Sequence, residues 1–192
     1  MTLEFLRPDA QGAVARSPME RQALAAGARM AVRDGWNVAV AYAGETPDAP
    51  VTWTDSSHLT KLEVHGRHDL TPGLASRTNG AWWCPITPDR TLVIGGARDA
   101  VEDHVDVTTA FAALTIAGPQ AREVFARFCA LDLRPQATPV HGFRPGSVAR
   151  TPGFVLREDE DRFLMLFGWA LGEYMWTVVA DAAERLGGVP HA

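Results

Sequence analysis

Residues 105–135 read VDVTTAFAALTIAGPQAREVFARFCALDLRP, and the hydrophobic period changes within this stretch. In its first half the apolar residues alternate, with Ala112, Leu114 and Ile116 on one face, which predicts a half-buried β-strand. The Gly-Pro pair at 118–119 ends that strand. Proline suits the first turn of a helix, because the N–H that it lacks would have no partner within the helix there. Apolar residues then recur at the spacing of one helix face: Ala121, Val124, Phe125, Phe128 and Cys129. We therefore expect a strand, a tight turn and a helix that folds back on a sheet.

The composition bounds the class of protein. The chain has 192 residues, of which 46% are hydrophobic, and this suits one domain with a buried core. Its net charge of −5 gives no reason to expect nucleic acid or an anionic membrane as a partner. Neither a secretory signal pattern nor an apolar run of about 18 residues occurs, so we expect a cytoplasmic protein without a membrane span. Residues 1–16 are expected to form an N-terminal arm and residues 17–192 a single domain.

Two stretches of the chain resemble each other. Residues 55–66 and 106–118 both begin with Asp and hydroxyl side chains, and both end in an apolar alternation closed by Gly. A hairpin pattern follows each of them, with turns at 87–90 and 158–161. This similarity predicts an internally duplicated α+β fold of two related sheet-and-helix subdomains, at about 17–104 and 105–192.

Further elements are predicted outside these stretches. The Ser-Pro-Met-Glu pattern at 17–20 is a capping box that starts a helix, with Gly27 near its end. An alternating strand is expected at 36–42. Residues 69–80 contain Pro and two Gly, so the helix expected in that half is short or missing. A last helix is expected from about residue 170, with one apolar stripe: Leu171, Met175, Val178, Val179, Ala182 and Leu186.

Several side chains could carry chemistry, but none completes a catalytic constellation. Cys84 could be a nucleophile beside a histidine, yet it has no local signature. Cys129 lies on the predicted apolar helix face, so a buried free thiol is expected there. The acidic residues 158–161 are most simply an exposed hairpin turn. A metal site is the less favoured interpretation of four histidines, because they lack the spacing of a helix-borne motif: His58, His65, His68 and His104.

The pair Trp82-Trp83 is a candidate contact surface. In an alternating strand only one of the two side chains faces the core. The other should be exposed, or should cover a ligand or a partner, because tryptophan is enriched at interfaces. Trp82 and Trp83 are therefore candidates for contact with a partner or ligand.

Over residues 18–66 the sequence resembles the glycine-cleavage T-protein, an aminomethyltransferase. The resemblance rests on residues 27–30, on Gly35-Trp36, on Tyr42 and on residues 55–66. That family usually has Asp-Val-Ser-His-Met before this strand, and Leu59 stands here at the Met position.

A second resemblance covers most of the chain. It is to the gamma subunit of heterotetrameric sarcosine oxidase, a protein of similar length. Its motifs are Ser17-Pro18, Pro88-Asp89 and residues 105–108, 117–119 and 132–135. The two families share a folate-binding fold of two related subdomains, which agrees with the internal duplication.

The T-protein resemblance implies tetrahydrofolate at the centre of the fold, with a carboxylate that assists one-carbon transfer. It also implies folate contacts at His58 and Leu59, for which a capped strand start and core packing are the structural alternative. The segment 82–85, Trp-Trp-Cys-Pro, is expected near the place of that carboxylate. An uncharged pocket there would not stabilise a cationic iminium-like species, which argues against independent T-protein activity.

The gamma-subunit resemblance implies a non-catalytic accessory subunit of a flavin- and tetrahydrofolate-dependent amine oxidase. Flavin would be bound only by partner subunits, which would be flavoproteins contacting this chain through exposed Trp and Arg side chains. One alternative is a free-standing tetrahydrofolate-binding aminomethyltransferase. Another is a folate-binding repair or regulatory module without turnover.

Overall fold

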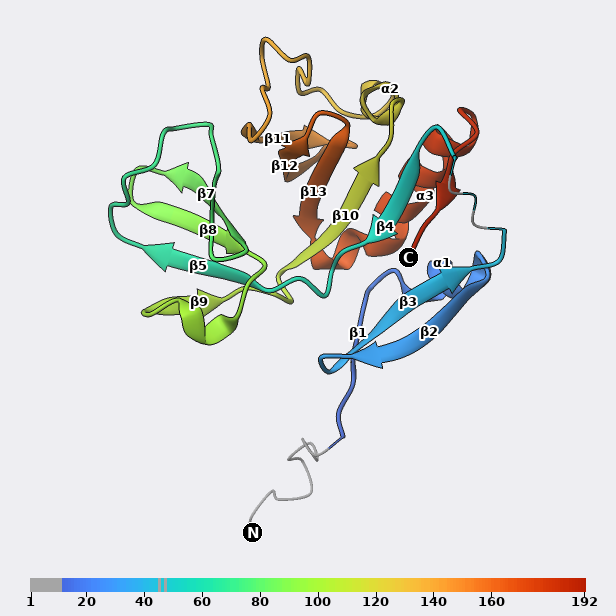
Figure 1. Cartoon of the computed structure of the whole chain (residues 1–192), viewed down its shortest axis with the longest axis horizontal. Helices are drawn as coiled ribbons and strands as arrows, with labels where there is room; N and C mark the ends of the chain where they lie inside the picture. Colours follow the sequence, from blue (N-terminus) through green and yellow to red (C-terminus); the bar gives the residue numbers. More distant parts are fainter. Residues whose placement is uncertain (1–11, 45, 47) are drawn as a thin grey trace.

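The computed structural model describes residues 12–44, 46 and 48–192, and three sheets organise this part of the chain (Figure 1). The central sheet has six strands and is antiparallel except for its last pair, in which β14 runs parallel to β4. In spatial order its strands are β11 (Phe143–Val148), β12 (Thr151–Asp159), β13 (Arg162–Gly168), β10 (Phe111–Ala117), β4 (Thr52–Asp55) and β14 (Val189–Pro190).

The second sheet has five antiparallel strands, and the third has three strands near the N-terminus. The five-stranded order is β6 (Ser76–Thr78), β7 (Ala81–Thr87), β8 (Arg90–Ile94), β5 (Lys61–His65) and β9 (His104–Asp106). In the third sheet β3 (Trp36–Tyr42) lies between β1 (Ala15–Arg16) and β2 (Ala28–Arg33).

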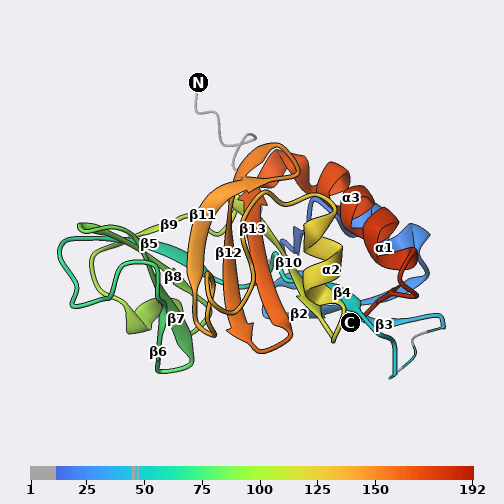
Figure 2. The ribbon, with the colours of Figure 1, turned by 90° about the horizontal axis from the view of Figure 1, so that it is seen from above.

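Helices and the five-stranded sheet cover opposite faces of the central sheet (Figure 2). The helices of the described residues are α1 (Glu20–Ala25), α2 (Ala121–Ala126) and α3 (Gly172–Glu184), with short 3-10 turns η2 (Arg98–Ala100) and η3 (Trp169–Leu171). The predicted α+β class is confirmed.

The decisive strand β10 is buried on both faces, so the prediction of a half-buried strand is wrong. Leu114 and Ile116 pack into the core beneath the helices, together with Val124. Ala113, on the other face, packs into the core shared with the five-stranded sheet. The side chains of β10 do alternate between two faces, but each face packs into a core. The five-stranded sheet covers the face that was expected to meet solvent.

The helix after β10 is shorter than its apolar pattern predicts. Ala121, Val124 and Phe125 are buried on its inner face, as expected. Phe128 and Cys129 lie beyond its last residue and are only partly buried. The chain leaves the helix there because Cys129 forms a β-bridge with Val148 at the end of β11.

The two stretches that resemble each other in sequence exchange strands between the sheets. β4 belongs to the central sheet and leads into β5 of the five-stranded sheet, whereas β9 of the five-stranded sheet leads into β10 of the central one. Each exchange begins at an aspartate that caps the residue two positions later. Ser57 N–H donates to Asp55 at 3.0 Å, and Thr108 N–H donates to Asp106 at 2.9 Å.

Equivalent hydrogen bonds then join the two exchanges. The hydroxyl of Ser57 accepts the N–H of Ala113 at 3.2 Å, and the hydroxyl of Thr108 accepts the N–H of Lys61 at 3.0 Å. The predicted internal relation is thus present as a set of matched contacts, and two related subdomains are confirmed. The boundary near residue 104 stays a prediction.

Removing either hydroxyl should cost comparable stability. Ser57→Ala and Thr108→Val each leave a buried backbone N–H without its acceptor, and each should lower the free energy of unfolding by about 1–3 kcal/mol. Thr109→Val, at an exposed position next to Thr108, should change it by less than about 0.5 kcal/mol. Urea unfolding measures all three, and a Thr108→Val protein as stable as the Thr109→Val control would contradict the matched roles.

The remaining predicted elements are confirmed with small shifts. Both hairpins are present, as β7–β8 and β12–β13, and the described residues 69–80 contain no helix. The first helix begins at Glu20, with Met19 as its N-cap, instead of at the Ser17 cap. The predicted arm, residues 1–16, lies mostly outside the described residues, but Ala15 and Arg16 form β1.

Candidate functional site

A cavity of about 900 Å³ lies where the three sheets meet. Its walls come from residues 33–39 in the β2–β3 hairpin, residues 54–60 at the first strand exchange, and residues 95–98 after β8, with Ala192 at the rim. Ligand cavities are commonly 300–1,000 Å³ in volume and often lie between subdomains. This central cavity is therefore the candidate functional site.

The structure brings both predicted folate residues, His58 and Leu59, to the central cavity. They follow the turn in which Asp55 accepts the N–H of Ser57, and after this turn the chain lines the cavity. The His58 side chain is exposed at the cavity wall. The protein atoms around its ring partly exclude water and lower its pKa, and the Asp55 carboxylate partly opposes this shift. A neutral imidazole at neutral pH both donates and accepts hydrogen bonds. Leu59 is half-buried and also packs against the core between the two large sheets.

Lys61 stabilises the segment 57–59 through hydrogen bonds to its backbone. It is the only lysine in the sequence and is fully buried. Its ammonium donates to the carbonyls of Ser57 at 2.8 Å and Leu59 at 2.9 Å. Burial lowers its pKa to about 8, and the Asp55 and Asp106 carboxylates oppose that shift. Sequence reasoning misses this residue, although its being the single lysine was an available signal.

Charged side chains of both signs line the central cavity. Arg33 and Asp34 come from the β2–β3 turn, Asp55 from β4, and Arg98 from the segment after β8. Arg98 is paired with Asp106 at 3.0 Å. The expectation of an uncharged pocket is therefore wrong, because it assumed that residues 82–85 form the wall. The actual walls carry two carboxylates and two guanidinium groups.

Trp82 and Trp83 lie away from the central cavity. Trp82 is the core-facing member of the pair, 6% exposed, and its indole N–H donates to Glu158 at 3.0 Å. Trp83 is half-buried and packs edge-on against His68, with ring centroids 5.5 Å apart. Contact with a partner or ligand stays a prediction, and only Trp83 has exposed surface to make it without rearrangement.

Glu158 is more buried than the predicted exposed turn. Its side chain is 16% exposed and bonds Arg162 at 3.0 Å as well as the Trp82 indole. The strands β12 and β13 run on to Asp159 and Arg162, so the turn consists of fewer residues than the acidic run. Glu158 thus joins the two large sheets.

The structure gives no support to thiol or metal chemistry. Cys84 is fully buried, and burial, together with the nearby Glu158 carboxylate, raises its pKa far above that of a reactive thiol. Cys84 and Cys129 are both free, and Cys129 is partly buried. Within the described part of the chain, no three His, Cys, Asp or Glu side chains gather where they could hold a metal ion. No described helix is long and apolar enough to cross a membrane.

Comparison with known proteins identifies the fold. No protein-family model and no curated protein sequence matches the chain. A chain of the heterotetrameric sarcosine oxidase from Corynebacterium sp. U-96, in complex with pyrrole 2-carboxylate, superposes with a TM-score of 0.70 and 18% identity, covering 93% of this chain and 99% of that one. The glycine cleavage system aminomethyltransferase T from Bartonella henselae superposes with a TM-score of 0.69 and 16% identity, covering 92% of this chain and 59% of that one. The protein therefore has the aminomethyltransferase-like fold that the sequence resemblance predicts.

Proposed function

We propose that this chain is an accessory subunit, without a catalytic site of its own, of a flavin- and tetrahydrofolate-dependent amine oxidase. The observation that carries the proposal is coverage: the chain matches 99% of one chain of a heterotetrameric sarcosine oxidase. The flavin of the complex would be bound by flavoprotein partner subunits, and this chain would supply only a folate-type site and a contact surface.

The central cavity supports tetrahydrofolate as the ligand of this chain. A folate has a flat polar ring system and an anionic tail. Arg33 and Arg98 line the walls and suit the tail, and the small exposed part of Trp36 would contact the ring system. His58 and Leu59 line the same cavity. No residue of this set is assigned a bond-making role.

A free-standing tetrahydrofolate-binding aminomethyltransferase is the second candidate. It is favoured by Asp34 and Asp55, which line the cavity and whose carboxylates would stabilise a cationic one-carbon intermediate bound beside them. The chain spans 59% of the length of the aminomethyltransferase that it resembles, so that activity would have to be carried out with less protein.

Two measurements test these functions. Co-expression with flavoprotein subunits of an amine oxidase should give a complex that elutes together with this chain, and elution of the chain alone would overturn the subunit role. Tetrahydrofolate titration should change Trp fluorescence saturably, because Trp36 lines the cavity. Trp36→Phe should remove most of that change and Trp83→Phe should not. Turnover of an aminomethyl donor by the isolated chain would favour the second candidate.

A further inference from the structure

A second cavity, of about 510 Å³, lies at the opposite end of β8 from the central one. The central cavity is reached at Gly95, just past the end of this strand, and the second cavity at Thr91, near its beginning. Its walls are residues 67–73, the β7–β8 hairpin at 85–91, and residues 143–145 of β11. Both subdomains thus contribute to it.

Part of the wall of the second cavity is apolar. It presents two aliphatic side chains and a group of prolines, none of them fully buried: Leu70, Ile86, Pro72, Pro85 and Pro145. Phe143 also lines the cavity, but its side chain is fully buried and stacks on Phe154. Such rigid apolar walls suit the flat face of a ring, since little side-chain entropy is lost on contact.

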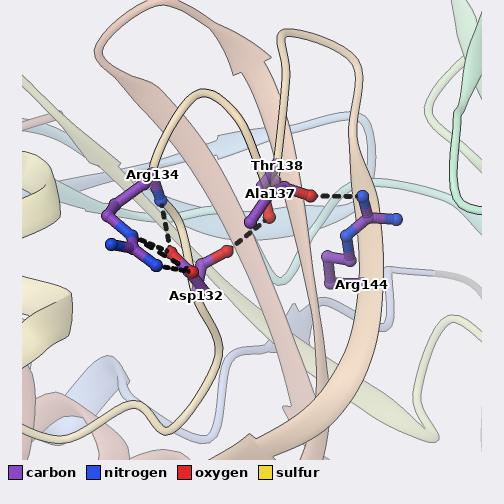
Figure 3. A network of polar contacts seen from close by, with 5 residues as sticks. All are labelled: Asp132, Arg134, Ala137, Thr138 and Arg144. Carbon is purple, nitrogen blue, oxygen red and sulfur yellow. Dashed lines mark hydrogen bonds and ion pairs between the residues drawn. The ribbon is translucent and has the colours of Figure 1, made fainter.

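Arg144 gives this cavity a fixed positive charge. Its guanidinium donates to the carbonyl of Gly73 at 3.1 Å. It also donates to the carbonyl of Ala137, as Figure 3 shows. It is half-buried and forms no ion pair with any residue that the structure describes. A partly desolvated guanidinium without an anion is unusual, because its charge is then compensated only by carbonyl dipoles.

The acid close to the Ala137 loop is already engaged. Asp132 binds Arg134 through both carboxylate oxygens, at 2.6 Å for the closest pair (Figure 3). Thr138 donates to the Asp132 carbonyl at 2.7 Å, which fixes the loop that presents Ala137 to Arg144. The guanidinium is therefore held in place, with N–H groups beyond the two that these carbonyls use.

Gly73 lies directly against the Arg144 guanidinium, since a Cβ on Gly73 would lie 2.3 Å from Nη1 of Arg144. The residue has φ +77°, a conformation that favours glycine. On the exposed loop opposite, Arg67 adds a second cation that is likewise in no ion pair with the described residues. Asp69 is the one carboxylate among the lining residues.

We propose that the second cavity binds a small organic carboxylate that carries an apolar ring. The ring would lie against Leu70, Ile86 and the proline-lined wall, and the carboxylate would accept hydrogen bonds from Arg144, with Arg67 adding longer-range attraction. The inference concerns a site separate from the central cavity and does not rest on the subunit role.

The test uses 1-naphthoate and its uncharged isostere 1-naphthamide with the full chain. Calorimetry should show one saturable site for naphthoate and at least about tenfold weaker binding of the amide, since a charge-assisted hydrogen bond is lost. Arg144→Met should weaken naphthoate binding at least about tenfold and Arg67→Met about two- to fivefold. Backbone amide shifts in ¹⁵N spectra should appear at 67–73, 85–91 and 143–145.

Matched variants make the result decisive. Arg29→Met removes an exposed arginine of β2, outside this cavity, and His58→Gln alters the central cavity; neither should change the affinity for naphthoate. If Arg144→Met fails to fold, Arg67→Met on the exposed loop still decides. Equal affinity for naphthoate and naphthamide, an Arg67→Met protein that behaves like Arg29→Met, or shifts confined to 33–39 and 54–60 would overturn the proposal.

Discussion

Replacing Lys61 by Met is expected to abolish a rise in stability of about 3 kcal/mol between pH 8 and pH 10.5. The folded pKa of Lys61 is lowered to about 8 by burial, against 10.5 for a free lysine. Below pH 8 the ammonium is charged in both states, so the folded protein bears the full cost of burying it. Between the two values the folded state loses its proton while the unfolded state keeps it, and stability rises with pH.

The difference between wild type and variant is the quantity to measure. Cys84 acts in the opposite direction, because its raised pKa keeps the folded thiol protonated while the unfolded thiol ionises. That contribution is the same in both proteins and cancels on subtraction. Lys61→Met also removes the hydrogen bonds to Ser57 and Leu59, so the informative quantity is the change of the difference with pH and not its absolute value.

Urea unfolding at intervals from pH 7 to pH 10.5 supplies the free energies. A wild-type-minus-variant difference that stays constant over this range would mean that Lys61 keeps an ordinary pKa in the folded protein. Amine-reactive reagents give a second reading: Lys61 should be unlabelled in the native state and labelled after unfolding, because it is fully buried.

Local patterns in the sequence predict much of this fold. The Asp-initiated, Gly-terminated stretches at 55–66 and 106–118 identify the duplication, because caps and positive-φ turns demand particular residues wherever they occur. The strand β2 is missed, since its residues are at most half-buried and leave no alternation to detect. A strand that packs weakly on both sides has no hydrophobic period.

The candidate sites are predicted less well, because cavities depend on how elements meet. A family resemblance selects His58 and Leu59, which both line the central cavity, and their contact with folate stays a prediction. Arg33, Asp34 and Arg98 reach the same space from elements that no local pattern joins. Likewise, the hydrogen bond between Trp82 and Glu158 joins residues 76 positions apart. The sequence around each residue therefore does not predict that the Glu158 carboxylate is buried against the Trp82 indole.

Gly118→Ala should destabilise the protein by about 2–6 kcal/mol, well beyond the equivalent change at Gly66. Both glycines end a strand of the duplicated unit, with φ +118° at Gly118 and +114° at Gly66. Both donate their N–H to the turn of the following hairpin, at 2.9 Å to Asp161 and to Asp89 respectively. The backbone strain introduced by a Cβ is therefore closely matched at the two positions.

The surroundings of the two glycines differ, because the backbone that leads into β4 passes close to Gly118 and nothing passes close to Gly66. A Cβ on Gly118 would lie 2.6 Å from the carbonyl oxygen of Pro50 and 3.0 Å from Cα of Val51, whereas a Cβ on Gly66 meets nothing within 4 Å. Gly66→Ala should cost only the strain, about 1–3 kcal/mol, and Gly118→Ala about 1–3 kcal/mol more for the clash with the backbone that leads into β4. Equal losses in urea unfolding would mean that residues 50–51 move aside freely.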